Sequence, residues 1–399
     1  MPDRTRKTIY SKTTQRTKHV SGYRRASEYA EQKVFRKGGI DAGFLSVVII
    51  LLVLGLLMVF SASYPSANYN FDDGLYFIRR QAIWAAIGVA AMIFTIRFDY
   101  RLYKKMAVPI AITTLIFLVA VFAFPAVKGA RRWIGFGSFS FQPSEMAKIA
   151  VIIYFAAGLS VTKERIRDIR QLTRYWGMLL IVLGLLILEP HFSVCLIIGF
   201  VAVIMLLVAG AQIKHFALAS VVAVPVVIAV ATNADYRMDR LKVYWDPFID
   251  KQGDGWQIIQ SLYAIGSGGF FGLGFGNSRQ KYMYVSEPQN DFIFAIVCEE
   301  LGMVGAFVII ALFGILIWRG IKIAMNAPDM FGSLLVTGLI SLIGVQVFLN
   351  IAVVTKLIPT TGISLPFFSA GGSSLVFLMA AMGMVLNVSR FKTQIVDIK

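Results

Sequence analysis

Long apolar blocks separated by short polar segments make up the chain from about residue 43 onward. Each block is long enough to cross a lipid bilayer as a helix, and the ten-residue alternating segments of a membrane β-barrel are absent. The pattern therefore predicts an all-α polytopic membrane protein with about ten transmembrane helices. The expected spans are 43–63, 81–98, 106–124, 143–161, 176–190, 192–210, 216–231, 291–318, 331–354 and 374–390.

One polar segment is far longer than the others and lies between the seventh and eighth expected spans, at 232–290. Within it, Tyr236–Trp245 and Trp256–Ile265 carry apolar and aromatic residues at helical spacing, which is typical of helices lying in the membrane interface. We expect one membrane domain, 42–392, that contains this loop. A basic tail, 1–41, precedes the domain, and a short tail, 393–399, follows it.

The formal net charge of +17 is a signature shared with nucleic-acid-binding proteins, but its distribution indicates membrane topology instead. If the N-terminus is cytoplasmic and the spans alternate, 26 of the 39 Lys and Arg residues fall in cytoplasmic segments and 12 outside. Half of those twelve lie in the long loop, where the positive-inside rule has little weight. We therefore expect both termini in the cytoplasm, the long loop on the outer face, and no nucleic-acid partner.

Cysteine and histidine offer no metal-binding cluster. The two cysteines, Cys195 and Cys298, fall in apolar spans and are typical of small buried residues. The three histidines, His19, His191 and His215, are scattered along the chain. The sequence therefore predicts neither a disulfide nor a His/Cys metal centre.

Asp291 is the most informative acidic residue, because it stands where the long polar loop enters an apolar helix. A carboxylate at the mouth of a membrane helix is costly to desolvate and usually has a function or a partner. It could cap the helix, whose dipole favours a carboxylate at this end, or act as a general base on the outer face. Glu287, four residues earlier, is either a solvated loop acid or a group that orients the base or holds a divalent cation, Mg²⁺ or Mn²⁺.

Four basic residues are candidates for an anion site on the same face. Arg131 and Arg132 belong to an outer loop that continues into Trp133, and Arg279 and Lys281 lie beside the glycine-rich run 266–276. Arginine forks suit phosphate oxygens, and closely spaced glycines permit positive φ and close backbone approach. The alternatives are a pair of arginines reaching to the membrane interface and a tight loop packed on the membrane surface.

Charged residues also occur inside the expected spans, where they are expensive unless paired. Glu145 and Lys148 are three residues apart and share a helix face, so that a structural ion pair is expected as readily as a direct role in catalysis. Glu299 and Glu300 point about 100° apart, so that at most one of them faces a given partner, with Lys148 or Lys356 as the candidate.

A segment rich in proline, glycine and hydroxyl side chains, 358–374, interrupts the apolar pattern between the last two spans and ends in Ser373 and Ser374. Bare backbone polar groups cannot face lipid, so this segment must line a cavity or re-enter the protein. We expect it to pack beside Asp291. Gln346 and Asn350, four residues apart on the preceding span, are expected to form hydrogen bonds between helices.

Taken together, these motifs resemble the SEDS family, the FtsW and RodA proteins of the bacterial cell wall. The resemblance covers nearly the whole membrane domain. The runs that carry it are Gly129–Ile134, Gln142–Glu145 with Lys148, Gln260–Gly269, Asp291–Ala295 with Glu299–Gly302, and Leu365–Phe367 with Gly371–Ser374.

The resemblance implies a ten-helix fold and a peptidoglycan glycosyltransferase that polymerises lipid II, a disaccharide-pentapeptide on undecaprenyl pyrophosphate. Asp291 matches the essential loop aspartate of the family, and Arg131 or Arg132 and Lys148 match positions of functional importance. The implied location is the bacterial cytoplasmic membrane, and the implied partners are a class B penicillin-binding protein that supplies transpeptidase activity and other proteins of the division or elongation machinery. The alternatives are a lipid II flippase and a non-catalytic scaffold that recruits a transpeptidase.

Three departures from the family pattern stand out. Where the family commonly has Pro-Asp-Phe/Leu-Gly-Thr, this chain reads Pro190-His191-Phe192-Ser193-Val194, which removes the acid. Lys356 stands where Gly is frequent, and Ala370 stands where Tyr is frequent. The long basic tail and the short C-terminus favour the FtsW-like division branch over the RodA-like branch.

Overall fold

The computed structural model describes residues 35–126, 129–136, 139–162, 169–217, 221, 225, 235–250 and 253–393. The helices are α2 (Ala42–Phe71), α3 (Tyr76–Arg97), α4 (Tyr100–Ala120), α5 (Pro143–Thr162), α6 (Ile169–Leu188), α7 (Phe192–Val208), α9 (Asp235–Trp245), α10 (Asp254–Gly268), α11 (Ile293–Met325), α12 (Met330–Val354) and α13 (Gly372–Ser389), with short 3₁₀ turns η1 (Val121–Ala123) and η3 (Pro247–Asp250). The strands are β1 (Phe35–Lys37), β2 (Ile134–Phe136), β3 (Phe139–Phe141) and β4 (Phe391–Thr393).

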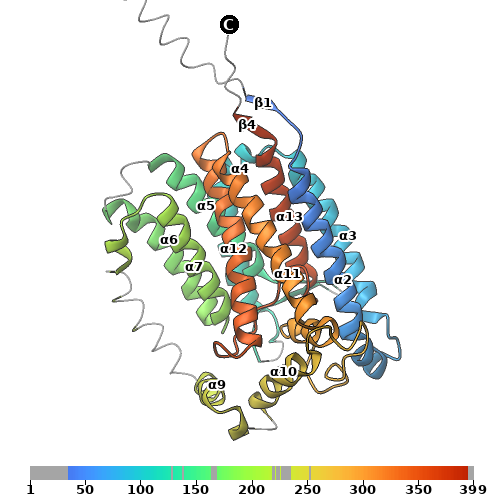
Figure 1. Ribbon diagram of the computed structural model, residues 1–399. Coiled ribbons are helices and arrows are strands. Elements are labelled where there is room, and N and C mark those ends of the chain that lie inside the picture. The colour runs from blue at the N-terminus through green and yellow to red at the C-terminus, as the bar shows by residue number, and fades with distance from the viewer. Residues whose placement is uncertain are drawn as a thin grey trace, which may run out of the picture.

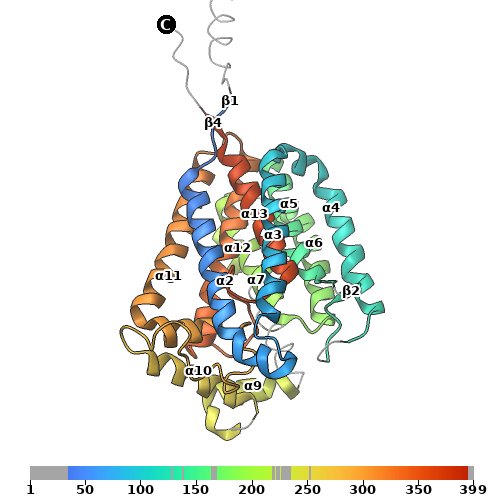
Figure 2. The same ribbon diagram turned by 90° about the vertical axis from the view of Figure 1, so that its right-hand side faces the viewer.

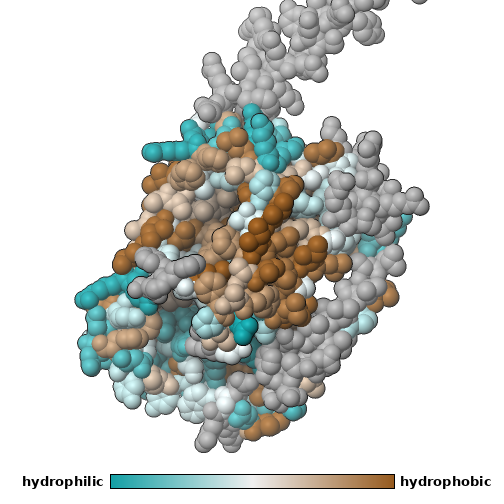
Figure 3. Space-filling view, turned by 180° about the vertical axis from the view of Figure 1, so that it is seen from behind, coloured by the Kyte–Doolittle hydropathy of each residue, from teal (hydrophilic) through white to brown (hydrophobic). Residues whose placement is uncertain are grey.

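The protein is a bundle of membrane-spanning helices. Within the described residues, seven helices, among them α2, α5, α11 and α12, are long and apolar enough to cross a membrane, and α7 and the part of α6 from Tyr175 to Leu188 are shorter apolar helices. The expected span 216–231 lies largely outside the described residues, so the count of ten stays a prediction. Figure 3 shows hydrophobic surface across the middle of the body and hydrophilic surface towards its ends.

Helix α12 forms the centre of the bundle, where it packs against α5, α7 and α11. Its inward face is closed by fully buried aliphatic side chains such as Leu334 and Ile343. Helix α13 packs along α3 and also contacts α5 and α12. The arrangement brings the N-terminal ends of α5 and α13, which are far apart in the sequence, to the same region of the bundle.

The two ends of the bundle differ (Figures 1 and 2). At one end β1 and β4 pair antiparallel, with Phe35 opposite Thr393, and this joins the segment before α2 to the end of α13. At the other end lie α9 and α10, the two amphipathic helices expected in the long loop. The first and last strands of the described chain and the helices of the long loop therefore lie at opposite ends of the bundle.

The two small sheets were absent from the all-α expectation. Strands β2 and β3 form a second antiparallel pair in which Ile134 lies opposite Phe141. Each strand has three residues, which is too short for a period-two pattern to stand out from the surrounding apolar sequence. The sheets add to the helical fold without changing it.

Candidate functional site

A cavity of about 210 Å³ opens beside Asp291, at the end of the bundle where the long loop lies. Of the residues expected at the site, it is lined by Asp291, Arg132, Glu145, Lys148 and Ser374. Further polar groups that the sequence did not single out as site residues also line it: Gln142, His191, Ser193, Asn290, Gln346, Ser364 and Ser369. The cavity thus combines carboxylates and cations in one partly enclosed space.

Four helices begin at this cavity. Lining residues come from the first turns of α5, α7 and α13, and Asp291 lies just before α11. At the opposite end of the bundle, α2, α4 and α12 begin with Asp41, Asp99 and Asp329, each of which accepts a hydrogen bond from a first-turn amide. By contrast, no such side-chain cap is present on α7, α11 or α13. Helix N-termini carry partial positive charge, so the cavity is arranged to receive an anion.

Asp291 is held by its backbone. The Asn350 side chain of α12 donates to the carbonyl of Asp291 at 2.8 Å and to that of Ile363 at 2.6 Å. It thereby joins the aspartate to the segment 358–371, which was expected to pack beside Asp291. Asn350 itself was expected to bond to another helix, but it bonds to backbone carbonyls outside the helices. Gly362 has φ +66, and a Cβ there would lie 3.3 Å from Asp291 Oδ2, so glycine permits the close approach. Helix α11 begins at Ile293 with Phe292 as its N-cap, so Asp291 precedes the capping position.

Glu145 and Lys148 form the ion pair that their spacing predicted, with 2.8 Å between Lys148 Nζ and Glu145 Oε1. Both side chains are largely buried and line the cavity. Arg132 comes from the loop before β2, and its guanidinium donates to the carbonyls of Glu189 and Pro190. These bonds anchor the guanidinium at the turn between α6 and α7, on the wall of the cavity.

Other expected site residues lie elsewhere. Arg131 is exposed and donates to the carbonyl of Phe122 at 2.9 Å. Glu287 is exposed, and its Oε2 accepts a hydrogen bond of 2.9 Å from Asn290. Arg279 is exposed and Ser373 is buried, and neither lines the cavity.

Lys281, Glu299 and Glu300 form a separate buried cluster, which corrects two expectations. Lys281 Nζ lies 2.9 Å from Glu300 Oε1, so the partner of this carboxylate is Lys281 and not Lys148 or Lys356. Ser61 of α2 also donates to Glu300 at 2.7 Å. Glu299 accepts hydrogen bonds from the Arg279 amide at 3.0 Å and from Ser278 Oγ. Both glutamates are therefore engaged, and Lys281 is bound away from the cavity.

Next to this cluster, the glycine-rich loop 266–276 packs against a break in α11. At Gly302 the backbone leaves the helical conformation, with φ 67. The freed backbone groups pair with the loop: Met303 N donates to Gly269 O at 2.9 Å, and Gly274 N donates to Glu300 O at 3.0 Å. The loop backbone thus satisfies the polar groups of a broken helix, as a low-dielectric surrounding demands.

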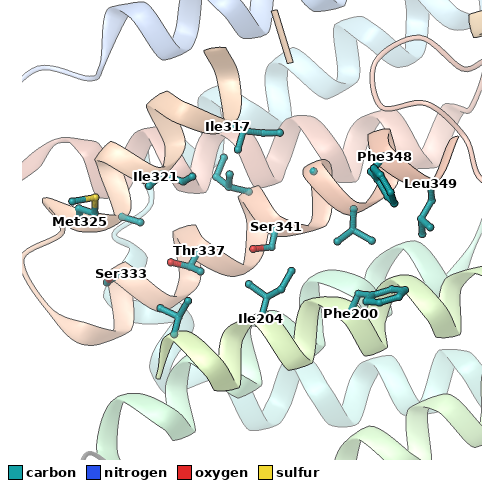
Figure 4. A pocket seen from close by; sticks show the side chains of 15 residues that line it. Phe200, Ile204, Ile317, Ile321, Met325, Ser333, Thr337, Ser341, Phe348 and Leu349 are labelled. Carbon is teal, nitrogen blue, oxygen red and sulfur yellow. The ribbon is translucent and has the colours of Figure 1, made fainter. Parts of the chain in front are cut away.

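A second cavity, of about 650 Å³, is a different kind of space. It lies between α7, α11 and α12 and is lined almost entirely by apolar side chains, with the hydroxyls of Ser333, Thr337 and Ser341 along α12 (Figure 4). No titratable group lines it. Of these two cavities, only the smaller one beside Asp291 is lined by titratable side chains.

Two ionisable groups on the turn between α6 and α7 are perturbed. Burial raises the pKa of the Glu189 carboxyl to about 8, although Arg132 acts in the opposite direction. Burial lowers the pKa of His191 to about 3, and Arg132 and Lys148 act in the same direction. In the described structure the two carboxyl oxygens of Glu189 have no hydrogen-bond partner, and Nδ1 of His191 has none either.

The described residues contain no group of three or more His, Cys, Asp and Glu side chains that could hold a metal ion. Glu287, the residue considered for a cation, bonds to Asn290 and lies outside the cavity lining. The described residues therefore do not form a dedicated divalent-cation site.

The fold has close counterparts among solved structures. A chain of a peptidoglycan synthase complex, described as coordinating polymerization and crosslinking, matches with a TM-score of 0.73 and 28% identity, over 88% of this chain and 98% of that one. The rod shape determining protein RodA of Thermus thermophilus matches with a TM-score of 0.64 and 26% identity, over 88% of this chain and 97% of that one. The helical arrangement is therefore shared with both proteins.

Sequence comparison leads to the same group of proteins. Stage V sporulation protein E of Bacillus subtilis is 43% identical over 364 residues, which is 89% of this chain and 98% of that protein. A protein of Trichlorobacter lovleyi named "Probable peptidoglycan glycosyltransferase FtsW" is 43% identical over 363 residues, 90% of this chain and 95% of that protein. A family model for FtsW, RodA and SpoVE, described as "Cell cycle protein", matches residues 42–394. The chain therefore belongs to the FtsW/RodA/SpoVE family of membrane proteins.

Proposed function

We propose that this protein is a peptidoglycan glycosyltransferase that polymerises lipid II into glycan strands. The observation that carries the proposal is the composition of the polar cavity: a carboxylate, Asp291, shares it with Arg132, Lys148 and the N-termini of several helices. A transferase whose donor leaves as a diphosphate needs a base at one point and positive charge at another. The names of the relatives and the synthase complex support the same assignment.

In the proposed reaction Asp291 removes the proton from the 4-hydroxyl of the acceptor GlcNAc. The oxygen attacks the anomeric carbon of the donor MurNAc, the bond to undecaprenyl pyrophosphate breaks with its electron pair, and the configuration inverts. The diphosphate leaves as an anion and needs no general acid, unlike the leaving group of a glycosidase. One base and stabilisation of the departing charge are therefore sufficient.

Arg132 and Lys148 are the side chains proposed to hold the diphosphate. Lys148 is paired with Glu145, which keeps its ammonium oriented and its charge balanced. The α7 and α13 N-termini add partial positive charge from the backbone. Arg131, Arg279 and Lys281 lie outside the cavity lining and are not assigned to this role. Ser374 lines the cavity and is proposed to contact the substrate.

The location of the site supports an outward-facing enzyme of the bacterial cytoplasmic membrane. The cavity lies at the end with α9 and α10, opposite β1 and β4, and we propose that this end is extracytoplasmic and that both termini are cytoplasmic. We also propose ten spans, with 216–231 as the seventh. The proposed partner is a crosslinking enzyme, a class B penicillin-binding protein, within a division complex more in keeping with FtsW than with RodA.

Polymerisation of labelled lipid II in detergent by the purified protein, with and without its class B partner, tests the function. A glycosyltransferase makes glycan strands in detergent, where a flippase has no membrane across which to move its substrate. A non-catalytic scaffold makes none with any partner whose own activity is restricted to crosslinking. Polymer that forms equally well without this protein would refute the proposal.

A further inference from the structure

His191 is placed at the cavity in a way that the proposed reaction does not use. It is the N-cap residue of α7, its side chain is 8% exposed, and it lines the cavity. Its backbone is fixed, because His191 N donates to Leu186 O at 2.9 Å and its carbonyl accepts from Cys195 N. Its side-chain Nδ1 has no hydrogen-bond partner in the described structure. A buried polar atom without a partner is costly, and a bound ligand is one way to satisfy it.

Several charged groups surround His191. Arg132 approaches from the loop before β2, Lys148 and its partner Glu145 from α5, and Asp291 from the segment before α11, and all four line the same cavity. Glu189 lies two residues earlier on the same turn and is buried. Burial and the two cations hold the pKa of His191 far below its ordinary value, so the imidazole is neutral at pH 7 without a neighbouring anion.

We propose that His191 contacts the diphosphate of the lipid-linked substrate and takes up a proton as that anion enters the cavity. The inference rests on the proposed function for the chemical class of the ligand, a prenyl diphosphate. Two observations carry it: the His191 side chain lines the cavity together with Arg132 and Lys148, and the N-terminus of α7, which has no side-chain cap, begins at the same residue.

The electrostatic reason is a reversal of sign around the imidazole. Burial opposes a positive charge on His191, and Arg132 and Lys148 oppose it further. A diphosphate brings at least two negative charges beside the imidazole and favours its protonated form. The imidazolium that forms can donate a charge-assisted hydrogen bond to a phosphate oxygen. Because binding and protonation are linked, the affinity for the diphosphate rises as the pH falls.

Calorimetric titration of the purified full-length protein with farnesyl diphosphate, in two buffers of different ionisation enthalpy at pH 7, counts the protons exchanged. We expect the wild type to take up about one proton more per ligand than His191→Asn, and the variant to bind about tenfold more weakly. The ligand releases or binds the same number of its own protons in both titrations, so the difference isolates the imidazole.

His215→Asn is the matched control, because His215 is a second partly buried histidine that does not line the cavity. It should retain the wild-type affinity and proton count. His191→Gln provides a second test of the position, and any unfolded fraction of either variant appears as reduced stoichiometry, not as an altered proton count. Equal proton counts for wild type and both His191 variants, or no binding of farnesyl diphosphate to the wild type, would overturn the inference.

The titration and the polymerisation assay distinguish a failure of the His191 proposal from a failure of the glycosyltransferase assignment. If His191→Asn matches the wild type in binding while polymerisation is intact, the role of His191 is wrong and the glycosyltransferase assignment stands. If binding takes up the expected proton but the protein with its partner makes no polymer, the diphosphate contact stands and the activity is wrong. The titration needs no turnover, so it is independent of activation by a partner.

Discussion

At the scale of single residues, the site depends on what surrounds each charge. Asn350 positions Asp291 through a hydrogen bond to the backbone carbonyl of Asp291, and Asp291 lines the cavity. Lys148 and Lys281 are both buried lysines in ion pairs, yet only Lys148 lines the cavity. The difference in their proposed roles follows from location and not from residue type.

Glu189 gives a pH dependence whose sign is fixed by the direction of its shift. Its carboxyl has a folded pKa of about 8 against an ordinary value of 4.5, so the folded protein retains a proton that the unfolded chain releases between these values. The stabilisation is complete below about pH 4.5 and is lost as the pH rises towards 8. We expect the melting temperature of the wild type to fall between pH 6.5 and 8.5, and that of Glu189→Gln to fall less.

The effects of Glu189 and His191 on stability fall mainly in different ranges of pH. The pKa of His191 is lowered from 6.5 to about 3, so the imidazole is neutral in the folded protein throughout the window, whereas in the unfolded chain it is half-protonated at pH 6.5 and loses that proton over the lower part of the window. Its own effect has the opposite sign and lies at lower pH. Glu287→Gln, at an exposed position, is the control and should follow the wild type. A wild type and a Glu189→Gln variant with the same slope would contradict the assignment.

At the scale of elements, the break in α11 is the feature that shapes the outer loop. The first part of the helix carries Glu299 and Glu300 to Ser278 and Lys281, and the interruption at Gly302 gives the glycine-rich loop backbone groups with which to pair. Asp291 lies immediately before this helix. The conformation of the glycine-rich loop therefore depends on its contacts with the break in α11.

Gly302→Ala tests that dependence. Gly302 has φ +67, and a Cβ would lie 2.3 Å from Gly272 N and 2.6 Å from Phe270 O, both backbone atoms. We expect a loss of stability of at least about 2 kcal/mol, measured as a lower melting temperature in detergent, because the backbone conformation and the contact are both unfavourable.

Gly314→Ala is the matched control on the same helix. Nothing lies within 4 Å of a Cβ at Gly314, whose backbone is helical, so the substitution should be neutral or stabilising by up to about 1 kcal/mol. If both variants melt together with the wild type, the break at Gly302 does not hold the loop as described.

The sequence predicted elements better than it predicted contacts. The apolar periods placed nine spans that overlap α2 to α7 and α11 to α13, with ends that differ by up to eight residues, and the amphipathic spacing located α9 and α10. The Glu145–Lys148 pair followed from helical geometry alone. The Lys281–Glu300 pair and the arrival of His191 at the cavity did not, because they depend on how segments far apart in the sequence fold together. The break at Gly302 was not predicted either, because the expected span 291–318 runs through it and a single glycine is no clear signal of a break.

At the scale of the whole molecule, polarity across the membrane is the main consequence of the fold. At the end of the bundle with β1 and β4, the N-termini of α2, α4 and α12 are capped by aspartates. At the end with Asp291, the N-termini of α7, α11 and α13 have no side-chain cap. The partial positive charge of the helix N-termini is therefore balanced by carboxylates at the first end and remains available to an anion at the second. The proposed outward orientation of that second face follows from the charge distribution along the chain.

Cysteine labelling in intact cells tests this orientation. Trp245, at the end of α9, is 81% exposed, and Met325, at the far end of α11, is 78% exposed. A membrane-impermeant maleimide should label Trp245→Cys in whole cells and label Met325→Cys only after the membrane is opened. The native Cys195 and Cys298 are buried and give a low background. Labelling of Met325→Cys in intact cells, without labelling of Trp245→Cys, would reverse the topology.

The most direct test of the account is the rate of lipid II polymerisation by Asp291→Asn, assayed with its class B partner beside the wild type. Removal of a general base is expected to lower the rate by about 10²-fold to 10⁴-fold, while the melting temperature stays near that of the wild type. Glu287→Gln, which changes an exposed carboxylate outside the cavity, should keep most of the activity. A folded Asp291→Asn protein that polymerises lipid II at the wild-type rate would contradict the account.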